Sequence, residues 1–338
     1  MNMLINGKEY LKNDLLRRAG NLDSLWGARR IALEDGMAGG MKAVEVWNAS
    51  GLRLLISIER CLDILELNYR GHNIGYLSKN GVVSNVYACP NSDLFFRYWS
   101  GGMLSTCGLR NTGISNESNG EFFPLHGHIG ITPAYHVGID VDDIGYITIT
   151  GAVRESDMFG HCFVLSRTIK IPVDRAEISV HDEISNNTPK DEPLFLLYHI
   201  NFGFPFLDDG VTIEFPEGDI RGHTPNATKE ISKHMEISAP VDEKPEQCFF
   251  HTLKHRDACV RITNKSLGFS SAIHYDAEKL PVLTEWKSMG SGDYGLGIEP
   301  GTCYLKGRDL ELKEGYACHV KAFDTSVYGF NIIFEDLT

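Results

Sequence analysis

The chain has little positive charge and no long apolar run. Its 338 residues include 32 Lys and Arg against 45 Asp and Glu, a formal net charge of -13. This charge repels nucleic acids and anionic membranes. No segment is long and apolar enough to span a bilayer, and Met1 to Gly20 has charged residues where a secretory signal has an apolar core. We therefore expect a cytoplasmic protein with neither a nucleic-acid nor a membrane partner.

The sequence also lacks the usual motifs for metals, cofactors and nucleophiles. None of the eight cysteines forms a CxxC pair, and their scatter indicates reduced, mostly buried thiols. A G-x-S-x-G elbow is absent, and Gly295-x-Gly297 lacks the rest of a dinucleotide fingerprint. We therefore expect no metal and no cofactor.

Three weaker signals remain open. His126 and His128 form an H-x-H pair that could hold a metal ion, although no third ligand is evident. Cys107 lies in a glycine-rich setting and is an alternative nucleophile. His251 and His255 lack the acid of an H-E-x-x-H motif, so we interpret both as surface residues.

Short segments of alternating apolar and polar residues predict an all-β protein. The chain has 34 glycines and 13 prolines, spread along its length as turns between strands would require. No long helical run separates the strands, which argues against a doubly wound parallel sheet. The predicted strands cover residues 43–47, 52–58, 62–67, 146–150, 163–171, 177–184, 211–215, 258–262, 317–323 and 330–334.

These strands favour one large antiparallel β-sandwich. Helix-like spacing over Glu9 to Gly27 predicts one or two short helices. Residues 216–247 are polar and turn-rich, and we interpret them as a long excursion between strands. With no linker or repeat visible, we expect a single domain over residues 1–338, with 1–40 as an N-terminal helical and turn extension.

Two residues stand out as candidates for acid–base chemistry. Glu299 is the carboxylate in a glycine-rich run, Tyr294 to Thr302, and His199 interrupts the apolar strand Leu194 to Gly203. A carboxylate and an imidazole suit proton transfer at a neutral oxygen. A lone histidine on an apolar strand is also a common core residue, so this alternative stays open.

Further residues are candidates for binding a sugar. Trp286 offers a stacking face, and polar side chains nearby would bond hydroxyl groups. Arg60 and Asp63 end a strand-like run, where a purely structural ion pair is the alternative. The other candidates are His126, Asn201, Lys287 and Tyr294.

Six segments occur in a characteristic order, at residues 15–20, 60–64, 101–109, 125–127, 199–205 and 286–300. Taken together, these segments resemble the aldose 1-epimerase (galactose mutarotase-like) superfamily, and more closely its bacterial branch DUF4432. The resemblance implies a large β-sandwich, or supersandwich, with a sugar cleft on a concave sheet. It implies that Glu299 and His199 are catalytic, that His126 holds a sugar hydroxyl and that Arg60 contacts the sugar. In mutarotases an Asn-His segment precedes the catalytic histidine, whereas here Asn201 follows it.

The resemblance predicts an isomerase that interconverts sugar anomers by Glu/His ring opening. A sugar isomerase, epimerase or lyase that uses the same pair is one alternative. A non-catalytic carbohydrate-binding or sensing protein is another. The partner in every case is a small sugar or sugar derivative, whose identity the sequence leaves open. A homodimer is also compatible with the sequence.

Overall fold

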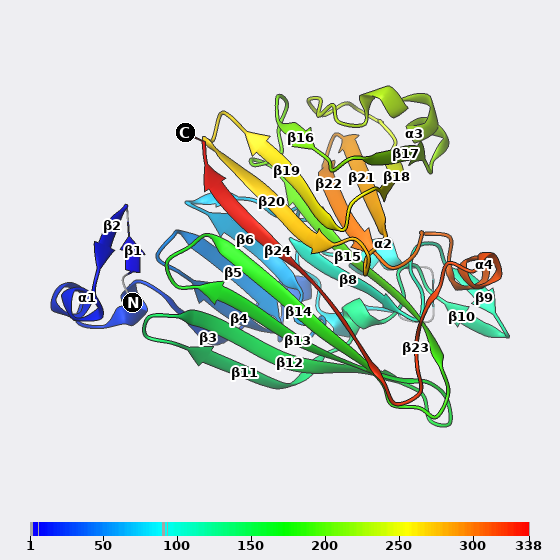
Figure 1. The fold of residues 1–338 in the computed structure, drawn as a ribbon, viewed down its shortest axis with the longest axis horizontal. Coiled ribbons are helices and arrows are strands. Elements are labelled where there is room, and N and C mark those ends of the chain that lie inside the picture. Colours follow the sequence, from blue (N-terminus) through cyan, green and yellow to red (C-terminus); the bar gives the residue numbers. More distant parts are fainter. Residues whose placement is uncertain (1–2, 6, 90–91, 93, 338) are drawn as a thin grey trace.

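Strands dominate the protein. The structure, a computed structural model, describes every residue except 1–2, 6, 90–91, 93 and 338. Its strands form three large sheets in which every paired neighbour is antiparallel. Each predicted strand segment overlaps a strand, and the all-β antiparallel sandwich is confirmed (Figure 1).

The largest sheet forms one layer of the sandwich and has eight strands. In spatial order they are β11 (Ala134–Val141), β12 (Tyr146–Ser156), β13 (Cys162–Pro172), β14 (Glu177–Asn186), β24 (Thr325–Asp336), β20 (Phe269–Asp276), β19 (Asp257–Asn264) and β16 (Thr212–Glu214).

The second sheet carries most of the candidate site residues. Its strand order is β17 (Gly218–Gly222), β18 (Gln247–Leu253), β21 (Val282–Gly290), β22 (Asp293–Gly301), β15 (Glu192–Gly203) and β23 (Cys318–Val320), and β8 (Leu104–Leu109) also pairs with β15. A third sheet follows the order β3 (Gly27–Ala32), β4 (Lys42–Trp47), β5 (Leu52–Ser57), β6 (Ile64–Tyr69) and β7 (His72–Asn73). Two small hairpins pair β1 (Met3–Ile5) with β2 (Lys8–Tyr10) and β9 (Asn116–Ser118) with β10 (Glu121–Phe123).

Helices are few and short. The α-helices are α1 (Lys12–Ala19), α2 (Phe95–Tyr98), α3 (Pro225–Lys229) and α4 (Arg308–Glu314), and single 3₁₀ turns are η1 (Leu22–Ser24), η2 (Gly36–Ala38), η3 (Asn85–Tyr87), η4 (Ile129–Ile131) and η5 (Ile231–Lys233). In the described part of the chain, no helix is long and apolar enough to cross a membrane.

The N-terminal segment combines both kinds of element. The short N-terminal helices expected from the sequence are present as α1 and η1. β3, however, lies within residues 1–40 and pairs with β4. It differs from the helical and turn structure expected there because Gly27–Ala32 extends the third sheet.

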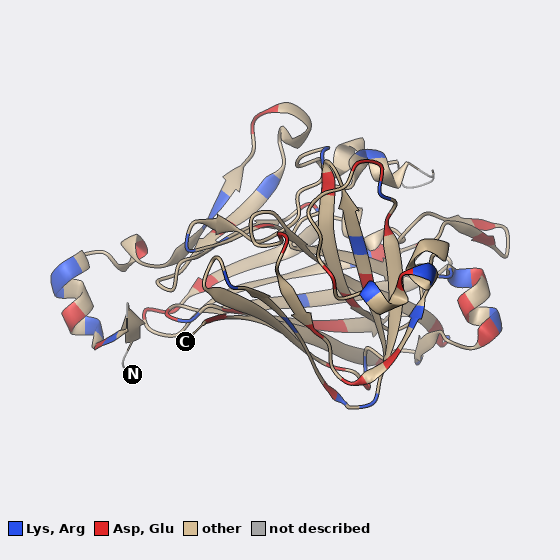
Figure 2. Cartoon of the chain, turned by 90° about the horizontal axis from the view of Figure 1, so that it is seen from above, with Lys and Arg blue, Asp and Glu red and all other residues tan. Residues whose placement is uncertain are grey.

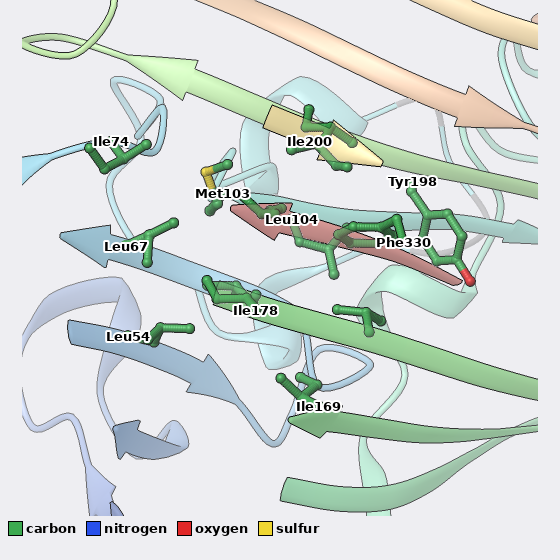
Figure 3. Close-up of a cluster of buried hydrophobic side chains, with 14 of the residues drawn as sticks. Leu54, Leu67, Ile74, Met103, Leu104, Ile169, Ile178, Tyr198, Ile200 and Phe330 are labelled. Atoms are coloured by element: carbon green, nitrogen blue, oxygen red, sulfur yellow. The ribbon is translucent and has the colours of Figure 1, made fainter. Parts of the chain in front are cut away.

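The main core lies between the sheets, directly beneath β15. Side chains from β5, β6, β8, β13, β14, β15 and β24 meet there (Figure 3). Tyr198 and Ile200 point into this core, and the Tyr198 hydroxyl donates to Asp182 at 2.8 Å. Because side chains alternate along a strand, His199 between them points to the other face of the sheet.

Charged residues of both signs are spread over the chain. Figure 2 shows Lys and Arg interspersed with Asp and Glu on helices, strands and loops.

Candidate active site

His199 and Glu299 lie opposite each other on neighbouring strands. β15 pairs with β22 in a register that joins Leu197 to Gly301 and Ile200 to Ile298, which places His199 across from Glu299. His199 Nε2 is 3.2 Å from Glu299 Oε1. Both side chains are almost fully buried, and neither Glu299 oxygen is hydrogen-bonded within the protein. Buried polar atoms are normally hydrogen-bonded, so this carboxyl group is free to bind a ligand.

Burial shifts both groups toward their neutral forms. It lowers the pKa of His199 to about 3, with the nearby His126 ring acting in the same direction and Asn201 against it. It also raises the pKa of Glu299 well above its usual value, and the charge of Glu246 adds to this effect. Desolvation disfavours the charged form of any group. Burial therefore favours a protonated Glu299 carboxyl beside a neutral His199 imidazole.

The pair lines a cleft of about 260 Å³. This volume is slightly below the roughly 300–1,000 Å³ typical of ligand pockets, which suits a ligand as small as a single sugar ring. His126 and Trp286 also line the cleft, so the structure brings four of the predicted site residues together. The His199 ring lies 5.7 Å from that of His126 and 5.6 Å from that of Trp286. Burial also lowers the pKa of His126, to about 4.

Several residues of the cleft were not predicted from the sequence. Phe95 and Phe96 come from α2, and Trp99 follows that helix with its ring 5.2 Å from His199. Glu246 lies at the rim, where its carboxylate accepts the Trp286 indole N–H at 2.7 Å. The dense aromatic run over residues 95–99 is the sequence feature that could have identified Phe95, Phe96 and Trp99. Glu246 lies in the turn-rich excursion, where no pattern marks it.

Arg60 and Asp63 do not line the cleft. The Arg60 guanidinium donates to the carbonyls of Val83 and Tyr98, at 2.8 and 2.7 Å. It shares a small cavity of about 30 Å³ with Trp99 and His126. Asp63 accepts from the Thr106 hydroxyl at 2.6 Å and from Arg167 at 3.0 Å. Arg60 thus holds the backbone that leads into Trp99, and Asp63 pairs with Arg167 in the core.

Asn201, Lys287 and Tyr294 do not line the cleft. The Asn201 amide donates to the Gly102 and His199 carbonyls, both at 3.0 Å. The Tyr294 hydroxyl donates to the Ser238 carbonyl at 2.7 Å. Lys287 follows Trp286 on β21, so it points to the opposite face of the sheet. The Asn201 amide nitrogen and the Tyr294 hydroxyl thus bond within the protein, whereas Asn201 Oδ1, like both Glu299 oxygens, has no hydrogen-bond partner there.

The structure also shows where the residues of the other sequence hypotheses lie, namely the possible nucleophile, the H-x-H pair and His251. Burial raises the pKa of the Cys107 thiol well above its usual value, which disfavours the thiolate that a nucleophile needs. His126 Nδ1 accepts a 3.4 Å hydrogen bond from the Gly113 amide, and His128 Nδ1 is 3.8 Å from Glu155. The expectation that His251 lies on the surface is wrong: it is buried because it bonds to Glu285 on the neighbouring strand β21.

The fold is that of the galactose mutarotase-like β-sandwiches. A "putative aldose 1-epimerase" from Klebsiella pneumoniae superimposes with a TM-score of 0.86 at 23% identity, covering 94% of this chain and 89% of its own. A galactose mutarotase-like protein from Clostridium acetobutylicum gives 0.68 at 14% identity, over 93% of this chain and 100% of its own. Galactose 1-epimerase from Lactobacillus acidophilus superimposes with a TM-score of 0.62 at 10% identity, covering 93% of this chain and 100% of its own.

A comparison with family models assigns the chain to one family. The chain belongs to the DUF4432 family, a domain of unknown function, whose model matches residues 38–333. A search of curated proteins found no significant match.

Proposed function

We propose that the protein is an aldose 1-epimerase-like mutarotase, in which Glu299 and His199 open and reclose the sugar ring. The observation that carries this proposal is the 3.2 Å contact between a carboxyl and an imidazole that line a small aromatic cleft. Aromatic faces suit the C–H face of a sugar ring. The free oxygens of Glu299 suit its hydroxyl groups.

The pair needs a single proton for the reaction. Burial disfavours both charges, and it therefore favours keeping this proton on Glu299 before a sugar binds. When a sugar binds, transfer across the 3.2 Å contact creates the Glu299 carboxylate and the His199 imidazolium. Each of these ions is stabilised by the other and by the hydroxyl groups of the ligand.

Ring opening then moves one proton at each end of the bond that breaks. The Glu299 carboxylate accepts the proton of the anomeric hydroxyl while His199 donates its proton to the ring oxygen. The bond between the anomeric carbon and the ring oxygen breaks, and a free carbonyl forms. Rotation next to the carbonyl and reclosure with the roles reversed give the other anomer. A positioned acid or base typically contributes ~10²–10⁴-fold to the rate.

The charges of the cleft favour a neutral sugar. The described residues that line it include no lysine or arginine, while Glu246 adds a carboxylate at the rim. A phosphate or carboxylate on the sugar would be desolvated there without a cationic partner, which is unfavourable. We therefore infer that neutral aldoses are the substrates.

His126 favours one alternative, an isomerase, epimerase or lyase that uses the same cleft. Its neutral imidazole lies 5.7 Å from His199, ring to ring, and could remove a proton from carbon in the open-chain sugar. Proton exchange at carbon would then accompany the reaction, whereas mutarotation leaves every C–H bond intact.

The test is anomer exchange measured by NMR in D2O with a panel of neutral aldoses. Mutarotation predicts exchange above the buffer rate with no deuterium at carbon. Deuterium at carbon would indicate the isomerase alternative. Saturable sugar binding without exchange would indicate a carbohydrate-binding protein and overturn the proposal.

A further inference from the structure

A second cluster of ionisable side chains lies on the other face of β21, away from the cleft. His251 on β18 and Glu285 on β21 share one face of the sheet, since Phe249 pairs with Glu285 and His251 with Leu283. His234 reaches the same place from the turn that follows η5. No metal-binding motif marks these three residues in the sequence, because they come from separate segments.

The two imidazoles converge on one carboxylate oxygen. His251 Nε2 is 3.0 Å and His234 Nδ1 is 3.1 Å from Glu285 Oε2. One nitrogen or oxygen atom from each residue lies within 4.8 Å of the other two. The three residues therefore present two nitrogens and one oxygen to a common point.

The carboxylate at the centre is only partly satisfied. Glu285 is fully buried, and its Oε1 has no hydrogen-bond partner. Among the described residues, its only ion-pair partners are the two histidines. A buried carboxylate with an unpaired oxygen is costly. A divalent cation would neutralise it and occupy the lone pairs that face His234 and His251.

The surroundings hold these ligands in place. Phe215 stacks on the His251 ring at 4.3 Å and also packs at 5.5 Å against His234. Lys287 donates to the carbonyls of Lys233, His234 and Glu236, at 2.8, 2.8 and 3.1 Å, which fixes the turn that carries His234. The His234 side chain is 14% exposed, so an ion could enter from that side.

We propose that His234, His251 and Glu285 form a zinc-type site for a divalent transition-metal ion. Two imidazoles and one carboxylate, with a position left for water, are a ligand set that zinc commonly takes. Nitrogen ligands favour zinc or cobalt over magnesium and calcium, which prefer oxygen. On binding, each histidine presents a deprotonated nitrogen to the ion and keeps its proton on the other ring nitrogen.

The role of the ion would be structural. Glu285 and Trp286 are consecutive on β21 and point to opposite faces, so the sheet separates the ion from Glu299. His234 would tether the segment 223–234 to the sheet. His223 and Thr224, at the start of this segment, line the cleft. The metal would therefore hold one wall of the cleft and take no part in proton transfer.

The test measures metal binding directly on the full chain. Chelator-treated wild type should bind one equivalent of Zn²⁺ by calorimetry, give the visible absorption of low-coordinate Co²⁺, and melt at a higher temperature with Zn²⁺. His234→Gln, His251→Gln and Glu285→Gln should each weaken Zn²⁺ binding by at least about 100-fold, more than loss of an outer-shell partner costs. His255→Gln, which alters a side chain that is 67% exposed, is the matched control and should bind as wild type does.

X-ray absorption of zinc-loaded wild type keeps the proposal testable if a variant misfolds. The site predicts nitrogen and oxygen ligands that include histidine. Sulfur ligation would assign the metal to cysteines and overturn the proposal. So would failure of the wild type to bind Zn²⁺, which would leave a purely hydrogen-bonded triad, or unchanged binding in all three variants.

Discussion

Gly297 leaves the space that Glu299 occupies. A Cβ atom at position 297 would lie 2.5 Å from Glu299 Oε1 and 3.2 Å from both the His199 ring and Trp286 Cβ. The register places Gly297 opposite Trp286 on β21. The absence of a side chain here therefore permits the contact between the carboxyl and the imidazole.

Gly297→Ala should displace the Glu299 carboxyl while the strand stays paired. A shift of about 1 Å in a reacting group can cost ~10²-fold in rate, so we expect a loss of that order in anomer exchange. Exchange rates from NMR, with circular dichroism as a check on folding, give the answer. A folded variant with wild-type exchange would contradict the proposed use of this contact.

Glu299→Gln should be more stable than wild type at high pH but not at low pH. Burial raises the pKa of Glu299 above the 4.5 of a free glutamate. The contribution of the protonated group to stability is therefore full below about pH 4.5 and is lost as the pH rises through the folded-state pKa. The variant should melt close to wild type near pH 4 and above it near pH 8. Equal melting temperatures at about pH 8 would argue against a raised pKa.

Trp286→Leu should weaken sugar binding more than it slows the chemical step. The substitution removes the stacking face and the donor to Glu246. Aromatic contacts of this kind contribute about 1 kcal/mol, so KM should rise ~5- to 10-fold with little change in kcat. Phe159→Leu is the control, since Phe159 is 98% exposed. A loss of kcat with unchanged KM would contradict this role of Trp286 in sugar binding.

Charged sugars should bind poorly. The lining described above has no cation to pair with an anionic group, and Glu246 repels one. We expect a hexose phosphate or a uronic acid to bind at least ~10-fold more weakly than the matching neutral hexose, a difference of about 1.4 kcal/mol. Calorimetry with matched pairs of sugars measures this directly. Tighter binding of the phosphate would overturn the inference of a neutral substrate.

The sequence was sufficient to predict an all-β antiparallel protein because alternation with period two is a local pattern. The same rule explains why some candidate site residues do not line the cleft. Lys287 was grouped with its neighbour Trp286, yet consecutive strand residues face opposite ways, and Lys287 bonds to carbonyls behind the sheet. Asp63 pairs with Arg167, 104 residues away in the chain, a partner that no local pattern reveals.

Contacts between residues far apart in the chain could not be predicted from local sequence patterns. Glu299 and His199 were paired by the resemblance to mutarotases, since nothing local joins two residues 100 positions apart. The contact of Glu246 with Trp286 spans 40 positions and begins in an irregular segment. His251 was misassigned for the same reason, because its partner Glu285 lies on the neighbouring strand β21.

The rate of anomer exchange in Glu299→Gln and His199→Asn, compared with wild type on the best neutral aldose of the panel, tests the central claim most directly. Each variant should lose ~10²–10⁴-fold, and the double variant little more, because residues that act as a unit are not additive. Glu183→Gln, which changes an exposed glutamate, should keep the wild-type rate. Wild-type exchange in both folded single variants would contradict the assignment of this pair.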